Sequence, residues 1–218
     1  MRVRCAVGLF AILFVAVGGM WGGTVPINDP SFEGLACGTT PGAVAQNCVP
    51  PGWTVTGTAD AALPPIGAWD SIPDGSQVAW SNSGTLTQVL STTVAPDTTY
   101  TLSVWVSERI NPANTFTPDI QLLDGSTPLI TLTTSSPGVV LPTKNVDGTY
   151  TWVDWIGTFT TGSTVDGDPL EISLGASSAQ SAFDEVSLAD SSAAPEPAMF
   201  ALVAVGLLGI VTRRRLAK

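Results

Sequence analysis

Short stretches in which apolar and polar residues alternate fill the middle of this chain, and they constrain its fold more than any other feature. They span residues 53–57, 77–81, 86–90, 99–107, 119–123, 129–133, 150–159, 170–174 and 182–188. Alternation places successive side chains on opposite faces of an extended chain, so each stretch predicts a half-buried β-strand. Outside the two ends of the chain, no window has the 3.6-residue period of a helix. The sequence therefore predicts an all-β fold.

Turn-forming residues separate these stretches, with Pro-Asp-Gly at 73–75 and Asp-Gly at 124–125 and 147–148. Such residues favour tight turns between strands. About nine strands in roughly 170 residues predict a single β-sandwich domain. We expect a jelly roll rather than an immunoglobulin-like topology, spanning residues 24–190.

The N-terminal residues have the three parts of a secretory signal peptide. Arg2 and Arg4 supply its positive charge, and residues 6–17 form an uncharged apolar stretch. Small residues suited to cleavage follow at Gly18, Gly19, Gly22 and Gly23. Val17 and Gly19 give one acceptable pair of small positions. We expect residues 1–23 to be removed on export, the alternative being an uncleaved membrane anchor.

The C-terminal residues 195–218 also have three parts, joined to the domain by a short linker at residues 191–194. The parts are Pro195, Glu196 and Pro197, then an apolar run over residues 198–212, then Arg213, Arg214 and Arg215. As a helix the run would be only about 22 Å long, short of a hydrocarbon core of roughly 30 Å. We expect a transmembrane helix aided by arginine snorkelling and local thinning of the bilayer. A buried helix is the alternative.

This tail, with its three parts in that sequence, resembles the PEP-CTERM sorting signal of Gram-negative bacteria. The resemblance implies export, transient anchoring in the inner membrane, and processing by an exosortase at the Pro195–Pro197 motif and the arginines. The final destination would be the cell surface or an extracellular matrix such as a biofilm.

The composition between the two ends excludes several functions. Arg109 and Lys144 are the only basic residues between positions 24 and 194, and they offset few of the Asp and Glu residues there. The segment is therefore strongly acidic and repels nucleic acid. The chain contains no histidine, which excludes Ser-His-Asp and Cys-His catalysis and histidine-ligated metals. We therefore expect no enzyme. A glycosidase, which needs only two carboxylates, is the alternative.

Two cysteines, Cys37 and Cys48, would remain after the leader is removed with Cys5. An even pair in an oxidising compartment predicts a disulfide. Closing so short a loop would stabilise the fold by about 3 kcal/mol.

A series of short motifs in the domain resembles the galactose-binding-like jelly rolls, which include carbohydrate-binding modules and choice-of-anchor surface proteins. The motifs lie at residues 28–34, 51–55, 73–77, 98–103 and 183–188. The resemblance implies a structural calcium ion held by Glu33 on the first strand and Asp184 on the last. The alternative is that both carboxylates are solvated at the rim of the sandwich.

Four of the six domain tryptophans have an assignment from alternation alone. Trp53 and Trp80 share a face with apolar neighbours, so both are predicted to be core residues. Trp152 and Trp155 fall on opposite faces of one strand, so at most one of them can lie in the core.

The other two tryptophans are the candidates for ligand binding, because sugar rings stack on indole rings. Trp69 lies in a predicted loop, and Trp105 lies on the polar face of its strand, with Gln77, Glu108 and Arg109 as possible polar neighbours. Ordinary packing against a covering loop is the alternative for both. The sequence thus predicts an exported surface or matrix protein that binds polysaccharide, the alternative being a structural component without a ligand.

Overall fold

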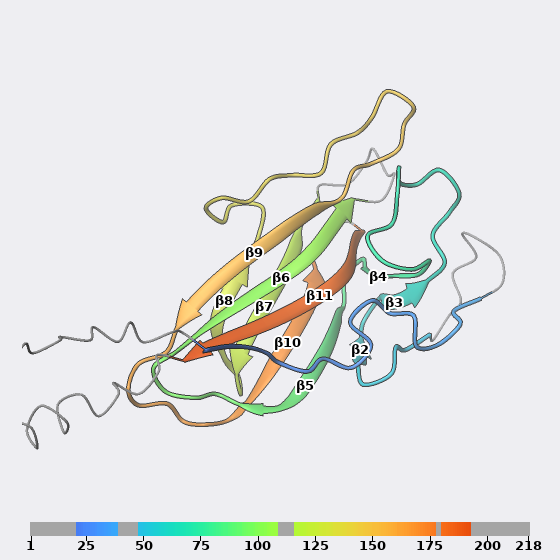
Figure 1. Ribbon diagram of the computed structural model, residues 1–218. Coiled ribbons are helices and arrows are strands. Elements are labelled where there is room, and N and C mark those ends of the chain that lie inside the picture. The colour runs from blue at the N-terminus through green and yellow to red at the C-terminus, as the bar shows by residue number, and fades with distance from the viewer. Residues whose placement is uncertain (1–20, 39–47, 109–115, 178–179, 193–218) are drawn as a thin grey trace, which may run out of the picture. The chain divides into compact units, whose positions relative to one another are not determined.

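The computed structural model describes residues 21–38, 48–108, 116–177 and 180–192, and its compact unit is Gly22–Ser192. Figure 1 shows two β-sheets stacked face to face. In the described ranges, no helix is long and apolar enough to cross a bilayer. The predicted signal peptide (apart from residues 21–23), the linker beyond Ser192 and the sorting tail lie outside these ranges.

The two sheets contain eleven strands among the described residues, and the pairings among β2 to β11 are antiparallel. The six-stranded sheet has the order β3 (Ala59–Ala62), β4 (Val78–Ser81), β11 (Ser181–Ser192), β6 (Thr98–Glu108), β9 (Val153–Thr160), with β1 (Trp21–Thr24) also pairing with β11. The five-stranded sheet has the order β2 (Thr54–Thr56), β5 (Thr85–Thr93), β10 (Pro169–Ala176), β7 (Pro118–Asp124), β8 (Thr127–Leu132).

Strand β6 illustrates how the sequence builds the core between the sheets. Its side chains at Tyr100, Leu102, Val104 and Val106 are buried, whereas the alternate side chains from Thr99 to Trp105 are partly exposed. The buried ones pack with residues of the opposite sheet, such as Leu122 and Ile172, in one continuous cluster that we call the inner core. Its apolar burial supplies the main force for folding.

The nine predicted strands correspond to β2 and to β4 through β11, so the all-β jelly-roll prediction is confirmed. Two strands were not predicted. Strand β3 is buried at all four positions, so its sequence Ala-Asp-Ala-Ala does not alternate. Strand β1 begins in the stretch assigned to the leader, which includes all of its residues except Thr24.

The predicted disulfide between Cys37 and Cys48 is present, with the two Cα atoms 5.6 Å apart. Trp53 is buried in the inner core, as predicted, and packs on Phe32 with ring centroids 5.4 Å apart. Trp80 is not buried in the inner core, so the core prediction for this residue is wrong. It pairs with Ala182 on the outer side of the sheet and stays half-exposed.

Candidate functional site

A second apolar cluster covers the outer face of the six-stranded sheet, away from the inner core. It consists of buried Val78, Trp152 and Ala182 with partly buried Trp69, Ile72 and Trp105 packed against them. We call it the outer cluster. Val78, Trp105 and Ala182 come from β4, β6 and β11, whereas Trp69 and Ile72 come from the loop between β3 and β4. One side of this cluster is therefore a sheet and the other is a loop.

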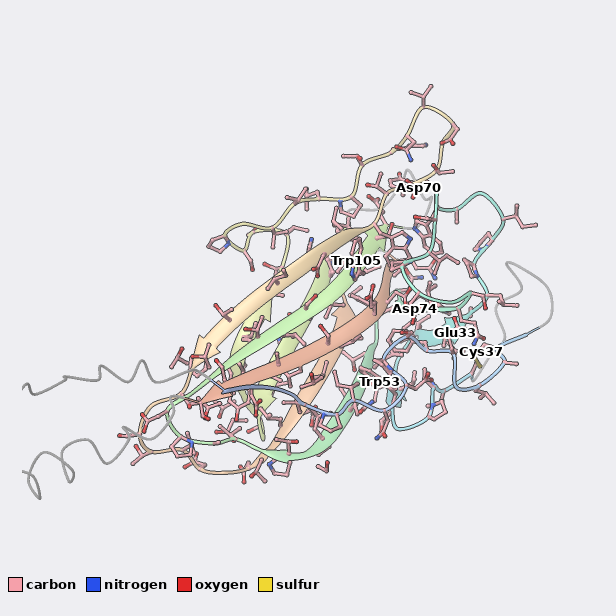
Figure 2. All side chains as sticks on the ribbon, viewed as in Figure 1. Glu33, Cys37, Trp53, Asp70, Asp74 and Trp105 are labelled. Atoms are coloured by element: carbon pink, nitrogen blue, oxygen red, sulfur yellow. A yellow bond between two sulfur atoms is a disulfide. The ribbon has the colours of Figure 1, made fainter. Side chains whose placement is uncertain are left out.

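The two predicted ligand-binding tryptophans both belong to the outer cluster. Trp105 is opposite Asp184 of β11 on one side and Asp154 of β9 on the other, on the outward face that alternation predicts; Figure 2 labels it on its strand. Trp69 packs on Trp152 with ring centroids 5.1 Å apart, and its Nε1 donates to the Glu108 carbonyl over 3.0 Å. Contacts from two directions thus hold the Trp69 ring.

The loop that carries Trp69 is fixed to the segment before β9 by backbone bonds. The Tyr150 amide donates to the Ala68 carbonyl over 3.0 Å, and the Asp70 amide donates to the Tyr150 carbonyl over 3.4 Å. These bonds pair Trp69 with Tyr150 as an isolated parallel bridge. The position of the indole therefore depends on the sheet beneath it and on the segment beside it.

A hollow of about 480 Å³ opens beside Trp69, and we call it the outer hollow. It is formed by residues 63–67, Trp69, Ser71, Ile72, Gly75 and Ser76. Most of the lining is apolar, and its two serine hydroxyls donate to the carboxylates of Asp70 and Glu33. Trp105 is not among the lining residues, so of the two predicted residues only Trp69 lines the hollow, whereas Trp105 packs in the outer cluster.

The polar neighbours expected around the ligand are only partly in place. Gln77 is 3% exposed, and its amide donates to the carbonyls of Phe32 and Leu35 while accepting from the Cys37 amide. All of its polar atoms are thus used to hold residues 32–37, so its placement beside a ligand is wrong. Burial raises the pKa of the Glu108 carboxyl. The backbone carbonyl of the same residue accepts the hydrogen bond from Trp69. Arg109 lies outside the described residues.

Glu33 and Asp184, the predicted calcium ligands, reach the same loop at residues 73–77. Glu33 Oε1 accepts from the amides of Ser76 (2.6 Å) and Gln77 (2.5 Å). Asp184 Oδ2 accepts from the Asp74 amide over 3.0 Å. The structure thus brings the two ends of the domain together at one loop, as the jelly-roll topology predicts.

Asp184 is an unusual carboxyl because it is fully buried. Burial raises its pKa to about 7, aided by the charges of Asp74 and Glu185 and opposed by hydrogen bonds from their amides. The register of β11 shifts just after it, at Glu185, whose φ is 45°. Lys144, the one basic residue in the described ranges, lies over the Tyr150 ring and not beside Asp184.

Whether this place fits a metal ion depends on its oxygen ligands. A buried carboxyl beside two further acids fits a hard cation such as calcium. Against this, both carboxylates already accept backbone hydrogen bonds, and the described residues contain no group of three or more His, Cys, Asp or Glu arranged to hold a metal. The calcium site therefore stays a prediction.

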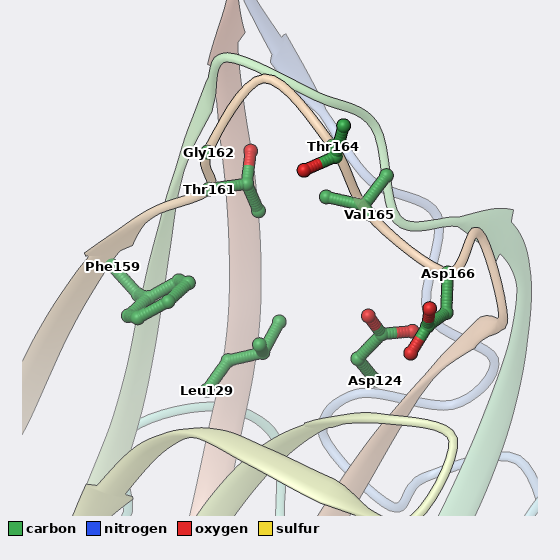
Figure 3. A pocket seen from close by; sticks show the side chains of 8 residues that line it. All are labelled: Asp124, Leu129, Phe159, Thr161, Gly162, Thr164, Val165 and Asp166. Carbon is green, nitrogen blue, oxygen red and sulfur yellow. The ribbon is translucent and has the colours of Figure 1, made fainter.

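A second hollow, of about 290 Å³, contains two carboxylates that sequence reasoning did not bring together. Figure 3 shows Asp124 and Asp166 facing one another, with Phe159 and Leu129 on the opposite wall. Burial raises the pKa of Asp124, and the charges of Asp168 and Asp166 raise it further. No sequence signal links Asp166 to Asp124, because their juxtaposition depends on the turn after β7 meeting the segment before β10.

Two family models match the chain. One, described as HpiC1 cyclase, matches residues 23–189, more than half of the chain. The other, the PEP-CTERM protein-sorting motif, matches residues 193–215. The second match confirms the sorting signal predicted from Pro195 to Lys218, which indicates exosortase-dependent export to the cell envelope or surface. Membrane anchoring stays a prediction.

Solved structures with a similar fold include the apo form of a cyclase from Fischerella sp., which is 20% identical with a TM-score of 0.58, covering 80% of this chain and 98% of that one. The CBM22-1 xylan-binding domain of Paenibacillus barcinonensis Xyn10C is 14% identical, with a TM-score of 0.41, covering 81% of this chain and 97% of that one. No curated protein sequence matches the chain significantly. The galactose-binding-like jelly roll predicted from the sequence is confirmed; at such identities the likeness concerns the fold alone.

Proposed function

This chain belongs to the HpiC1-like cyclase family, and we propose that in this protein the fold binds a ligand. The protein is exported and sorted by an exosortase to the cell surface or the extracellular matrix. There it binds polysaccharide at the outer hollow. The observation that carries this proposal is the position of Trp69. Its ring lines the hollow while Trp152 and the Glu108 carbonyl hold it in place. A ring fixed before binding loses little entropy when a sugar stacks on it.

The chemistry of the hollow and its surroundings narrows the polysaccharide. Ser71 and Ser76 line the hollow, and their hydroxyls, which donate to Asp70 and Glu33, keep lone pairs that can accept from a sugar with one apolar face and polar edges. The whole chain carries a net charge of −10, so the surface repels polyanions. We therefore expect neutral polysaccharides to bind in preference to those rich in uronic acids.

A glycan array probed with the exported form tests this proposal. Trp69→Ala should weaken binding to the preferred glycan at least about fivefold, because loss of a stacking ring removes about 1 kcal/mol or more. Trp80→Ala is the matched control, since Trp80 is a half-exposed tryptophan of the same sheet that does not line the hollow. Equal binding by both variants, or no glycan bound by the wild type, would refute the proposal.

The family match favours a second candidate, a cyclase. A carboxyl with a pKa near 7, such as that of Asp184, could donate a proton at neutral pH. Its full burial weighs against this role, because a substrate would first have to displace the loop at Asp74. Incubation with a bound ligand distinguishes the two: recovery of the ligand unchanged by NMR supports binding, and a rearranged product supports catalysis. Until then the absence of enzymatic activity stays a prediction.

We also propose that Glu33 and Asp184 hold a structural calcium ion at the loop of residues 73–77. The proposal is supported by the buried carboxyl of Asp184 beside two acidic neighbours. Calcium would offset their repulsion and fasten the first and last parts of the domain to one loop. Its role would be structural, and the binding of sugar would remain with Trp69.

The sorting tail makes its own prediction about the surface form. After exosortase processing, the mature protein should end near Pro195–Pro197 and lack Arg213 to Lys218. Intact mass spectrometry of the extracellular protein should show this loss. Recovery of the complete C-terminus outside the cell would contradict exosortase processing.

A further inference from the structure

Strand β1 is part of the folded sheet, although three of its four residues lie in the stretch that the sequence analysis assigned to the leader. It spans Trp21–Thr24 and pairs with β11. The Gly23 amide donates to Asp190 Oδ1 over 3.1 Å, and the Val25 amide donates to the Leu188 carbonyl over 2.8 Å. A Cβ atom at Gly23 would lie only 2.6 Å from Asp190 Oδ1, so a larger residue there would displace this carboxylate. The sheet therefore uses residues on the N-terminal side of Thr24.

The pairing of β1 also protects β11. Strand β4 covers that edge of β11 only at residues 181–183, and β1 continues the cover farther along the strand. A cut after Gly22 would remove two of the four residues of β1, and a cut after Gly23 would remove three of them together with the Gly23 bond to Asp190, so this edge of β11 would lose part of its cover. Unpaired edges invite association with other chains. Retention of β1 is thus favoured by the stability and the solubility of the domain.

The small-residue rule for leader cleavage points the same way, independently of the fold. Cleavage requires small residues at the last and third-last positions of the leader. Cutting after Gly22 or Gly23 would put Met20 or Trp21 at the third-last position, and both are bulky.

Cutting after Gly18 puts Ala16 at the third-last position, and cutting after Gly19 puts Val17 there. Only these two of the four glycine bonds satisfy the rule. We propose that the leader peptidase hydrolyses the peptide bond after Gly18 or Gly19, so that the mature protein begins at Gly19 or Met20 and keeps β1. Water adds across the bond, leaving a carboxylate on the leader and a new amino group on the domain.

N-terminal sequencing and intact mass of the exported protein test this assignment. The expected first residue is Gly19 or Met20. A protein that begins at Gly23 or Thr24, or that keeps Met1, would overturn the proposal.

A pair of leader variants makes the test sharper. Changing both Ala16→Phe and Val17→Phe keeps the stretch apolar but blocks both proposed bonds, so uncleaved precursor should accumulate on immunoblots. Trp21→Tyr alters the third-last position only for a cut after Gly23, and its processing should equal that of the wild type. Normal cleavage of the double variant would refute the proposed position.

Discussion

The inner core and the outer cluster lie on opposite faces of the same six-stranded sheet, yet they differ in construction. The inner core is packed between two sheets and is rich in aliphatic side chains. The outer cluster has a sheet on one side and a loop on the other, and half of its six side chains are tryptophan. The comparison suggests a division of labour in which one face stabilises the domain and the other face carries its binding chemistry.

Two tryptophans three positions apart make the difference concrete. Trp155 belongs to the inner core, is 1% exposed, and donates its Nε1 proton to the Val140 carbonyl over 2.8 Å. Trp152 belongs to the outer cluster, is 8% exposed, and has a buried Nε1 with no hydrogen-bond partner. Buried polar groups without partners are rare where packing serves stability alone. The outer face tolerates such a group, and with Asp184 it also contains a buried acid.

The largest effect expected from this comparison is that of Trp155→Ala. Removing a fully buried ring should lower the free energy of unfolding by about 3 to 5 kcal/mol. The matched variant Trp152→Ala should cost at least about 1 kcal/mol less, because it breaks no hydrogen bond. Urea denaturation of the two variants measures both. If Trp152→Ala proves the more destabilising, the two faces do not differ as described.

The next effect concerns Asp184, which lies on the outer side opposite Trp105. Its pKa is raised from an ordinary value of 3.8 to about 7 in the folded state. Folding therefore favours its protonated form, and the free energy of unfolding should fall as pH rises from about 4 to about 7. The ceiling is on the order of 4 kcal/mol. Melts in chelator across this range measure the slope, and Asp184→Asn should reduce it.

If Glu33 and Asp184 hold a calcium ion, adding calcium should reverse the fall in the free energy of unfolding that accompanies the rise in pH. At a calcium concentration a hundred times its dissociation constant, the wild type should gain about 2.7 kcal/mol, whereas Asp184→Asn should not respond. Identical wild-type melting curves in calcium and in chelator would refute the site.

The disulfide should have an effect of similar size, felt chiefly at the loop that borders the outer hollow. The Cys37 amide donates to Gln77, and Gln77 follows Gly75 and Ser76 of the hollow. Replacing both cysteines by serine should cost about 3 kcal/mol or less. Amide hydrogen exchange should accelerate in residues 73–77 before it does in β6. Uniform acceleration would mean that the disulfide supports both faces equally.

Sequence reasoning predicted the inner core well and the outer cluster poorly, for physical reasons. A period of two locates strands such as β6 and the residues that they bury. The sequence predicts Trp80 to be a core residue because it shares a face with Val78. Both residues lie on the outer side of β4, and that side is also apolar because it carries the outer cluster. Apolar alternation identifies a shared face and does not say which face. Trp69 and Ile72 lie in a loop, where no periodicity reports a contact.

The same limit explains the outcome for the candidate site. Trp105 could be placed on the outward face because it lies in a regular strand. The outer hollow depends on a loop held by Tyr150, which is far away in the sequence. The acids Asp124 and Asp166 likewise meet only through the folded topology. Long-range contacts of this kind leave no local pattern in a single sequence.

The smallest effect expected is that of Trp105→Ala on stability, and it separates the two faces most directly. Trp105 is partly exposed and makes apolar contacts in the outer cluster, so its removal should cost about 1 to 2 kcal/mol, well below the cost at Trp155. Glycan binding should nevertheless weaken, because Trp105 packs in the cluster that positions Trp69. Trp105→Phe keeps an aromatic ring there and should restore part of the binding. A cost equal to that of Trp155→Ala, measured in the same urea series, would place Trp105 in the structural core and remove the distinction between the faces. Unchanged glycan binding with the small loss of stability would instead limit the ligand site to the walls of the hollow.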